Sequence, residues 1–527
     1  MKLPKKLVTT RWGWLSIVGA AAAYALMGAS AVAAADPTRV IVAFKPGAAA
    51  AIRSAVLAAR GSVKLEIFGM DAMAVEVPTQ SLNGLARNPN VEYVEEDVKR
   101  HPLSGTTPST GTPYASGQLV PYGIKIVQAD LLSDSLAGNR KVCIIDSGYG
   151  LGHEDLDAST NVTGEYDSGT GWWYTDENHH GTHVAGTIAA LNNAGTGVVG
   201  VNPNQQLKLH IVKVFGADAW AYSSTLAAAA NKCGAAGANV ISMSLGGSLK
   251  SRTEQIAFDK LYTTGSGVLS IAAAGNDGNT RVSYPAGYAS VVSVAAIDEA
   301  MNWATFSQYN SDVEIAGPGV NVLSTVPTGT GTRSTLSVGA SAYDPGGMDG
   351  SPKVSASAPL ADFGLGGTAN PGSMSGKVCL IQRGTYDFAV KVSNCQSSGG
   401  VGAVVYNNVA GGFGGTLGTT VTSIPAVTAS DTEGAAMKQQ LGQTANVAVS
   451  AWNYAFFEGT SMATPHVSAV AALVWSLNLN CTATQLRNSL NKSAQDLGAA
   501  GRDTKFGFGL VQAKAADARI KSLGCGN

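Results

Sequence analysis

The sequence is poor in charge, in aromatic side chains and in cysteine, and each shortage argues against a class of function. Charged residues make up 13% of the 527 residues, aromatic residues make up 7%, and the net charge is −1. No cluster of lysine and arginine is interleaved with aromatic residues, so no nucleic-acid-binding surface is expected. No two of the six cysteines have the short C-x-x-C spacing typical of zinc sites, so a zinc site is not expected either.

Long apolar runs are also missing beyond the N-terminus. No later stretch is long and apolar enough to span a membrane, so no membrane partner is expected once the N-terminus is removed. We find no internal repeat with the period of a solenoid or propeller. The length instead predicts more than one domain, and 64 glycines predict many tight turns.

The first 35 residues have the three parts of a secretory signal peptide. A basic head at residues 2–11 precedes an apolar stretch at residues 12–29, and the small residues Ala33 and Ala35 follow. This pattern predicts cleavage after Ala35 and a secreted, extracellular protein. The alternative is an uncleaved membrane anchor, because the apolar stretch is somewhat long.

Export permits disulfides, and six cysteines allow fifteen pairings that sequence by itself does not distinguish. Proximity along the chain favours the pairs Cys379–Cys395 and Cys481–Cys525, which leaves Cys143–Cys233.

The chain after the signal peptide divides into four segments. Residues 36–103 alternate strand, helix, strand, helix and strand, which predicts a small α+β unit. Residues 104–329 begin with a polar linker and continue as apolar strands alternating with helices, the pattern of a parallel sheet covered on both faces. Residues 330–452 interrupt this pattern as a compact β-rich insert, and residues 453–527 return to apolar helices.

Ser461 lies in the stretch GTSMATPH, residues 459–466, which is the first candidate for a catalytic motif. A glycine leads into the serine, and an apolar run follows at residues 467–477. This predicts a serine at the start of a buried helix, whose N-terminal potential favours a developing negative charge. We expect Pro465 to lie in the first helical turn, where a missing N–H costs no hydrogen bond.

Asp146 and His180 supply the other groups that a nucleophilic serine needs. Asp146 ends a buried strand, and His180 opens a helix of small residues. A base must take the serine proton, and a carboxylate must fix the tautomer of that base. His183, one turn later, is the rival base. Metal ligation by Asp146, His180 and His183 is the competing chemistry, but an H-E-x-x-H ligand set is missing.

These motifs resemble the three active-site motifs of the subtilisin-like serine proteases, the subtilases. They are Asp146-Ser-Gly148, His180-Gly-Thr-His-Val-Ala-Gly-Thr187 and Gly459-Thr-Ser-Met-Ala-Thr-Pro-His466, in the order of the family. The resemblance implies a subtilisin-like α/β catalytic domain of three layers with a parallel sheet. It also implies that Ser461 is the nucleophile, His180 the general base and Asp146 the acid that orients it.

The resemblance extends to the oxyanion site. Residues 272–276, AAAGN, are similar to the oxyanion segment of the family, so Asn276 would donate from its side chain and the Ser461 N–H would be the second donor. The alternative for Asn276 is a turn residue before Asp277-Gly278.

The family also implies which backbone binds substrate. The expected residues are Ser244, Leu245, Gly246 and Gly247 for one pocket wall, Ala274 and Gly275 for the other, Gly216 for the facing edge and Ser283 for the pocket base. No charge lies at that base, so an uncharged residue before the scissile bond is favoured, although Asp277 at the rim leaves room for basic residues.

Two further segments match subtilase accessories. Residues 36–103 look like an inhibitor-type propeptide, so self-cleavage is expected after Leu103, with Arg100 and His101 as rival sites. The insert resembles a protease-associated (PA) domain through Gly376–Gly384 and Gly402–Tyr406. Its alternative role is a stability or lid module without a ligand.

A structural calcium site is also implied by the resemblance. Its expected ligands are oxygens of Gln118, Asp155, Leu191, Asn193, Thr196 and Val198. The loop is one residue longer than the commonest form, which leaves open whether Thr196 or a neighbour contributes a carbonyl. The alternative is a solvated Asn/Gly turn.

The predicted protein is therefore a secreted serine endopeptidase made as a self-processing preproenzyme. Its expected partners are protein and peptide substrates and its own propeptide as an intramolecular inhibitor, and it is expected to be a monomer. Two other classes remain open: a non-catalytic peptide-binding relative, and an adhesive surface protein that uses the insert.

Overall fold

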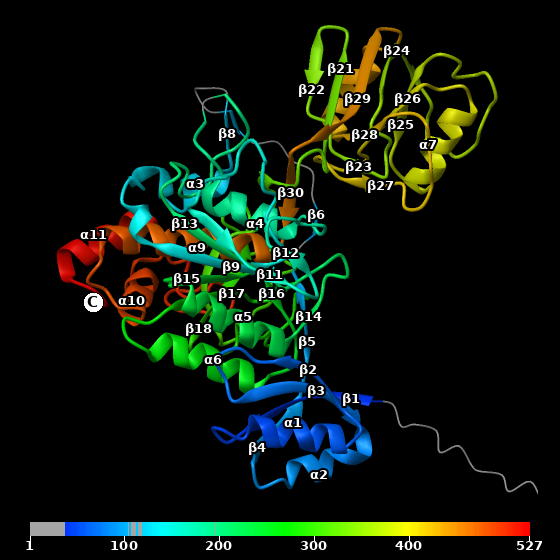
Figure 1. Ribbon diagram of the computed structural model, residues 1–527. Coiled ribbons are helices and arrows are strands. Elements are labelled where there is room, and N and C mark those ends of the chain that lie inside the picture. Colours follow the sequence, from blue (N-terminus) through cyan, green and yellow to red (C-terminus); the bar gives the residue numbers. More distant parts are fainter. Residues whose placement is uncertain (1–36, 104, 107–111, 114–117, 194) are drawn as a thin grey trace, which may run out of the picture.

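The computed structural model describes residues 37–103, 105–106, 112–113, 118–193 and 195–527. The predicted signal peptide, residues 1–35, and Ser104 lie outside these residues. Figure 1 shows three parts: an N-terminal unit, a central body and an insert that projects from it. No helix of the described residues is long and apolar enough to cross a bilayer.

The N-terminal unit is a four-stranded antiparallel sheet in the order β2-β3-β1-β4. Its elements are β1 (Pro37–Phe44), α1 (Ala49–Ala58), β2 (Ser62–Glu66), β3 (Ala72–Pro78), α2 (Leu82–Ala86) and β4 (Val91–Glu96). Val40 and Val42 pack in one cluster with α1 and α2, whereas Ile41 and Ala43 pack in a cluster with the central body. The short polar edge strand β2 was not predicted.

The central body is built on seven parallel strands in the order β10-β13-β9-β15-β17-β18-β19. The strands are β9 (Lys141–Asp146), β10 (Val162–Gly164), β13 (Lys208–Lys213), β15 (Val240–Met243), β17 (Leu269–Ala273), β18 (Val291–Ile297) and β19 (Val313–Pro318). The main helices are α4 (His180–Ala189), α5 (Ser223–Ala235), α6 (Arg252–Thr263) and α9 (Thr460–Leu477).

The alternation of side chains along β9 divides the core into two layers. Val142 and Ile144 pack in one cluster with residues of α4 and α9. Cys143 and Ile145 pack in another with residues of α5 and α6. Helices therefore cover both faces of the sheet, which confirms the predicted three-layer α/β fold.

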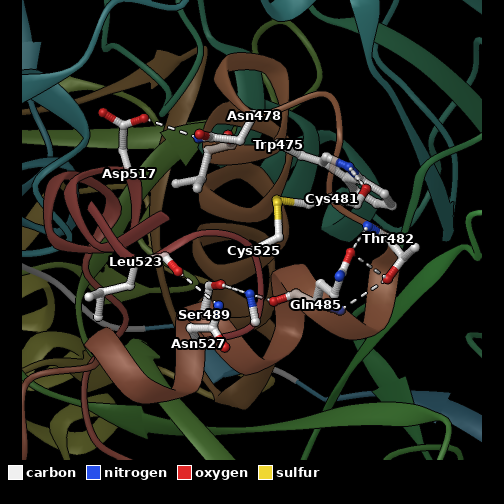
Figure 2. Close-up of a disulfide and its surroundings, with 12 residues drawn as sticks. Trp475, Asn478, Cys481, Thr482, Gln485, Ser489, Asp517, Leu523, Cys525 and Asn527 are labelled. Carbon is white, nitrogen blue, oxygen red and sulfur yellow. Dashed lines mark hydrogen bonds between the residues drawn. A yellow bond between two sulfur atoms is a disulfide. The ribbon is translucent and has the colours of Figure 1, made fainter. Parts of the chain in front are cut away.

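The C-terminal helices are tied to α9. After α9 the chain forms α10 (Ala483–Ser493) and α11 (Ala513–Leu523). A disulfide joins Cys481, before α10, to Cys525, after α11, and Trp475 Nε1 donates to the Cys481 carbonyl over 2.8 Å (Figure 2). The three disulfides of the structure are Cys143–Cys233, Cys379–Cys395 and Cys481–Cys525, the pairs that sequence proximity favours.

The insert has its own seven-stranded mixed sheet, in the order β22-β21-β29-β24-β25-β26-β28. Its elements are β21 (Gly331–Val338), β22 (Ser341–Tyr343), β24 (Ser355–Asp362), β25 (Val378–Gln382), α7 (Phe388–Ser397), β26 (Gly402–Tyr406), β28 (Ala426–Ala429), α8 (Asp431–Lys438) and β29 (Thr444–Trp452). Its flanking strands β20 (Val322–Thr325) and β30 (Tyr454–Glu458) pair antiparallel, so the insert leaves and re-enters the central body at adjacent points (Figure 1).

The remaining elements are short. They are β5 (Lys99–Pro102), β6 (Gly105–Thr106), β7 (Thr112–Pro113), β8 (Leu119–Val120), α3 (Tyr122–Ile126), β11 (Tyr166–Asp167), β12 (Gly171–Trp172), β14 (Ala221–Tyr222), β16 (Leu245–Gly246), β23 (Met348–Asp349) and β27 (Gly415–Thr416).

Candidate active site

Asp146 and His180 meet at the carboxyl edge of the central sheet. Asp146 ends β9, His180 begins α4, and His180 Nδ1 lies 2.7 Å from Asp146 Oδ1, with the two side chains 1% exposed or less. The Ser147 N–H donates to the same carboxylate oxygen over 2.7 Å. His180 Nε2 is buried without a hydrogen-bond partner among the described residues. A carboxylate at Nδ1 selects the tautomer in which Nε2 is free to accept a proton.

Ser461 is the second residue of α9, at the end of the helix that carries partial positive charge. Its Oγ donates to the Ser244 carbonyl over 2.9 Å and accepts from the Leu103 N–H over 3.1 Å. While the Leu103 N–H contacts Ser461 Oγ, the Ser461 hydroxyl proton therefore points at the Ser244 carbonyl oxygen and not at His180.

Pro465 lies in the second turn of α9, so its expected place in the first turn was wrong. Because proline has no N–H, the Ser461 carbonyl loses its partner four residues later in the helix. The Ser244 hydroxyl donates to that carbonyl over 2.7 Å instead. Ser244 thus replaces a helical hydrogen bond and ties one wall of the cleft to the predicted nucleophile.

Asn276 follows β17 at the same edge of the sheet. Its Oδ1 accepts from the Thr460 N–H over 2.9 Å and from the Thr460 hydroxyl over 2.7 Å. These two donors fix which way the amide faces, and its Nδ2 has no partner among the described residues. An amide nitrogen held in this way is available to a substrate oxygen.

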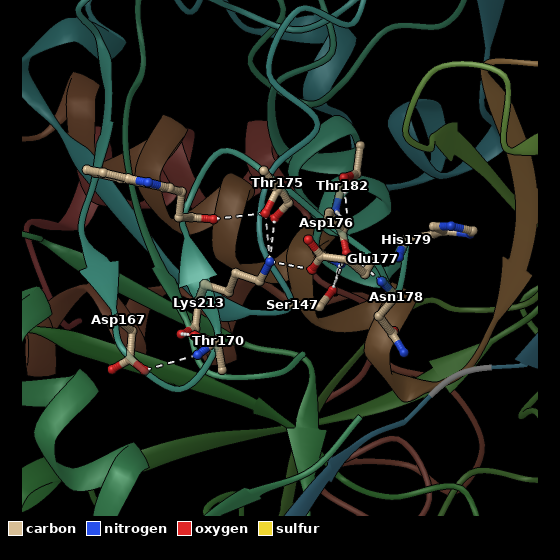
Figure 3. Close-up of polar contacts among 12 residues, drawn as sticks. Ser147, Asp167, Thr170, Thr175, Asp176, Glu177, Asn178, His179, Thr182 and Lys213 are labelled. Carbon is tan, nitrogen blue, oxygen red and sulfur yellow. Dashed lines mark hydrogen bonds and ion pairs between the residues drawn. The ribbon is translucent and has the colours of Figure 1, made fainter. Parts of the chain in front are cut away.

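Asp176 positions the predicted acid and base, and it is missing from the predicted site. Its Oδ1 accepts from the Ser147 hydroxyl and the His179 N–H, each over 2.8 Å (Figure 3). Its Oδ2 accepts from the N–H and the hydroxyl of Thr182. One buried carboxylate therefore joins the residue after Asp146 to the start of α4. The signal in the sequence was an aspartate just before a helix, where it satisfies free N–H groups.

His183 has a structural role. Its Nε2 lies 3.0 Å from the Val322 carbonyl oxygen and 3.1 Å from that of Ala455, and its ring stacks on Phe457. Burial lowers the pKa of His183 to about 3, with His180 adding to the shift, so the ring is neutral at neutral pH. It makes no hydrogen bond to Asp146 in the described structure, which argues against it as the base.

The end of the N-terminal unit occupies the predicted substrate cleft. Strand β5 runs antiparallel between β14 and β16, so an extended segment lies against the wall predicted at Ser244–Gly247. The facing edge is Ala221–Tyr222, so the prediction of Gly216 for that edge was wrong. The Gly216 carbonyl accepts from the Ala219 N–H over 3.1 Å, and Ala219 has φ 53°, so the backbone turns there and cannot pair with a strand.

Leu103 lies at the predicted primary pocket. Its N–H lies 3.4 Å from the Ser244 carbonyl oxygen. A Cβ placed on Gly246 would lie 3.1 Å from Leu103 Cδ1 and 2.3 Å from Ser283 Oγ. The leucine side chain therefore passes over Gly246, next to Ser283, the predicted base of the pocket. In the second wall, Ala274 is buried and the Gly275 N–H donates to Thr460 Oγ1 over 3.2 Å.

Two carboxylates of the N-terminal unit fix it to the central helices. Glu95 accepts from the N–H groups of Arg252 and Thr253 at the start of α6, over 2.7 and 2.8 Å. Asp97 accepts from the Ser224 N–H at the start of α5 over 2.9 Å. Carboxylates at these positions satisfy free N–H groups and complement the helix dipole.

Most residues of the predicted calcium site converge. Gln118 Nε2 lies 2.6 Å from the Leu191 carbonyl, 3.1 Å from Asn193 Oδ1 and 2.8 Å from the Val198 carbonyl. Gln118 Oε1 and Asp155 Oδ1 are buried without hydrogen-bond partners among the described residues. The oxygens of Leu191, Asn193 and Val198 thus surround the Gln118 amide nitrogen. Carbonyl, amide and carboxylate oxygens are the ligands that a hard cation such as Ca²⁺ requires.

Thr196 is placed in a turn of the same loop, where its N–H donates to the Asn193 carbonyl over 3.1 Å. In the described part of the chain no three His, Cys, Asp or Glu side chains form a group that could hold a metal ion. A cation here would therefore rely on amide and carbonyl oxygens around the single carboxylate of Asp155.

Comparisons with known proteins agree with this architecture. The Subtilase family matches residues 138–362 and 410–509, and the PA domain matches residues 350–437. The chain is 37% identical to the alkaline protease of Alkalihalobacillus alcalophilus over 52% of this chain and 68% of that protein. It is 30% identical to alkaline elastase YaB of Bacillus sp. (strain YaB) over 84% of this chain and 79% of that protein.

A solved structure is similar over most of the chain. The psychrophilic subtilisin-like protease Apa1 of Pseudoalteromonas sp. AS-11 is 43% identical, with a TM-score of 0.63, and the match covers 78% of this chain and 100% of that one. Fold, family pattern and relatives agree. This chain belongs to the subtilase family of serine peptidases and carries a PA domain inserted within its catalytic domain.

Proposed function

We propose that the protein is a secreted serine endopeptidase that hydrolyses peptide bonds in proteins through Asp146, His180 and Ser461 and is made as a self-processing precursor. Two observations carry the proposal. Asp146 and His180 are in contact over 2.7 Å, and the Leu103 N–H, at the end of the extended arm formed by residues 99–103, donates to Ser461 Oγ. Six cysteines paired in three disulfides support export, because disulfides persist in oxidising compartments.

The proposed chemistry assigns each group one task. Asp146 holds the Nδ1 proton of His180, so Nε2 takes the hydroxyl proton as Ser461 Oγ attacks the peptide carbonyl. Asn276 Nδ2 and the Ser461 N–H, which has no acceptor within the first turn of α9, stabilise the oxyanion. His180 then gives the proton to the leaving amine, and water releases the acyl group by the same steps in reverse.

A serine-directed phosphonofluoridate tests this proposal. The secreted protein is treated with the reagent, assayed on casein and digested for mass spectrometry. Loss of casein hydrolysis is expected together with one adduct on the peptide that contains Ser461. Full hydrolysis by a protein that carries the adduct, or an adduct elsewhere with loss of activity, would overturn the assignment.

We further infer that residues 37–103 act as an intramolecular inhibitor. The support is the position of β5 between β14 and β16, together with the helix caps made by Glu95 and Asp97. An extended peptide that pairs with both cleft edges excludes substrates that would pair in the same way. The inhibitor and the enzyme would act as one monomeric precursor.

Self-cleavage is predicted between Leu103 and Ser104, because Leu103 lies over Gly246 and its N–H reaches the Ser461 hydroxyl. N-terminal sequencing of the mature enzyme is expected to begin at Ser104. Leu103→Lys should slow processing, since a charge would enter an uncharged pocket. The control, Leu57→Lys, changes a leucine that is 63% exposed and should process normally. A mature start at His101 or Pro102, with faster cleavage of peptides after arginine than after leucine, would refute the site and the pocket.

We propose that the oxygens around Gln118 and Asp155 hold a structural Ca²⁺. The two buried oxygens without partners, Gln118 Oε1 and Asp155 Oδ1, fit the preference of Ca²⁺ for carboxylate, amide and carbonyl oxygens. The other ligands would come from Leu191, Asn193 and Val198. The ion would stabilise the fold by binding only the native state and has no part in the chemistry.

Chelation is therefore predicted to lower the melting temperature of the inhibitor-blocked enzyme. A ligand at a hundredfold excess over its dissociation constant contributes about 2.7 kcal/mol to the free energy of unfolding. Melting is measured in excess Ca²⁺ and in excess chelator. Asp155→Asn, which lowers the charge of the site, should melt at nearly the same temperature in both. A wild-type enzyme indifferent to chelator would reject the site.

A further inference from the structure

We propose that Glu254 sets the specificity of the pocket that receives the fourth residue before the scissile bond, and that it selects an arginine there. This inference rests on the proposed function, since it counts back from Leu103 as the residue at that bond. Arg100 of the arm is the fourth residue by this count. Glu254 lies in the first turn of α6, 154 residues further along the chain.

Arg100 and Glu254 form a two-point ion pair that is closed to water. Arg100 Nε lies 3.1 Å from Glu254 Oε1, and Nη2 lies 2.6 Å from Oε2. Both side chains are 0% exposed. The Tyr288 hydroxyl donates to Glu254 Oε2 over 2.6 Å. Because each Glu254 oxygen accepts from the guanidinium group and Tyr288 adds a donor, the carboxylate is held in the plane that an arginine fork recognises.

The pocket belongs to the enzyme and not to the N-terminal unit. Glu254, Tyr288 and Gly247 all lie beyond the predicted cleavage site. A Cβ on Gly247 would lie 3.1 Å from Arg100 Nη1 and 2.6 Å from the Lys99 carbonyl oxygen, so the glycine leaves the space that the guanidinium and the arm backbone use. The pocket walls therefore stay with the central body when the arm leaves.

The register of the arm separates this position from its neighbour. Arg100 lies opposite Ala221 of β14, and His101 lies opposite Gly246 of β16. Arg100 is fully buried, whereas His101 is exposed, and its Nδ1 lies 3.3 Å from the Ala219 carbonyl oxygen. The cleft thus contacts the side chain of the fourth residue before the scissile bond, whereas the side chain of the third residue is exposed to solvent.

Departure of the arm leaves Glu254 without a cation. Lys250 has its ammonium group 6.0 Å from the Tyr288 ring centroid, but it forms no ion pair with Glu254 among the described residues. A carboxylate in such a recess is costly to leave unpaired, so a substrate arginine that restores both contacts gains affinity. Lysine offers a single point charge and should gain less.

The test uses the mature, self-processed enzyme and four peptides, X-Ala-Pro-Leu-p-nitroanilide with X as Arg, Lys, Ala or Glu. We expect kcat/KM to be at least about tenfold higher for Arg than for Ala, with Lys between them and Glu lowest. Glu254→Gln should remove most of this difference, and Tyr288→Phe should reduce it. The control Glu299→Gln, at an exposed glutamate, should keep the wild-type pattern.

Equal rates for Arg and Ala in the wild-type enzyme would overturn the pocket and leave the proposed function intact. A preference that survives Glu254→Gln unchanged would overturn the role of Glu254. If Glu254→Gln is not processed, the wild-type series with Tyr288→Phe decides the question. Absence of hydrolysis of all four peptides and of casein would instead overturn the proposed function, and the pocket with it.

Discussion

Replacing Ser461 by alanine is expected to reduce peptide hydrolysis by roughly 10⁶-fold, a magnitude taken from the related enzyme subtilisin. The Oγ atom is the only group in the proposed mechanism that bonds to the substrate carbonyl, and neither His180 nor Asp146 replaces it. The same loss should block self-cleavage, so the variant should accumulate with residues 37–103 still attached. Casein hydrolysis and intact mass measure the two effects.

Ser468→Ala is the matched control for this variant. Ser468 lies on the same helix α9, is fully buried, and its Oγ has no hydrogen-bond partner among the described residues. Loss of that hydroxyl breaks no hydrogen bond of the described structure, so processing and activity should remain close to wild type. An active, mature-sized Ser461→Ala protein would refute Ser461 as the nucleophile.

Replacing Asn276 by alanine is expected to lower kcat by about 10²–10³-fold, again a magnitude taken from subtilisin. The contacts of Oδ1 with Thr460 fix the amide, and Nδ2 has no partner in the described part of the chain, so it can donate to the oxyanion without reorganisation. An oxyanion develops only during the reaction, so KM should change little. Steady-state kinetics on a leucine p-nitroanilide peptide separate the two constants.

The variant also removes the acceptor of two Thr460 hydrogen bonds, so its melting temperature is measured alongside. Asn302→Ala serves as control, because Asn302 is exposed and, among the described residues, its side chain hydrogen-bonds only to Asp298. A fall confined to KM, or a kcat within a few-fold of wild type in a protein of unchanged melting temperature, would contradict the oxyanion role.

Most of the architecture could be predicted from local sequence patterns. The continuous apolar runs at β9, β15 and β17 mark strands buried on both faces, and such strands form a parallel sheet whose carboxyl ends share one edge. For that reason the placement of Asp146 and Asn276 at one edge could be predicted from the sequence. The PA insert was recognisable because Gly376–Gly384 and Gly402–Tyr406 are contiguous motifs, and the PA domain match confirms it.

Three features of the structure differ from what was predicted, and local sequence patterns encode none of them. The shift of the facing edge from Gly216 to Ala221–Tyr222 depends on a turn closed at Ala219, and β2 has too few apolar residues to stand out. Pro465 in the second turn of α9 is tolerated because Ser244 donates to the carbonyl that the proline leaves unpaired. None of these features has a signature in its own few residues.

The family, the layered fold, the insert and the residue types of the candidate site could all be predicted from local patterns, because each is encoded in contiguous motifs or in short-range hydrophobic periodicity. The contacts between distant groups could not be predicted in this way: Ser244 with Ser461, Asp176 with both Ser147 and Thr182, and Arg100 with Glu254. Strands that are neighbours in the central sheet are not consecutive in the chain. A contact across them depends on the packing of the whole sheet and its helices, and no local pattern encodes that packing.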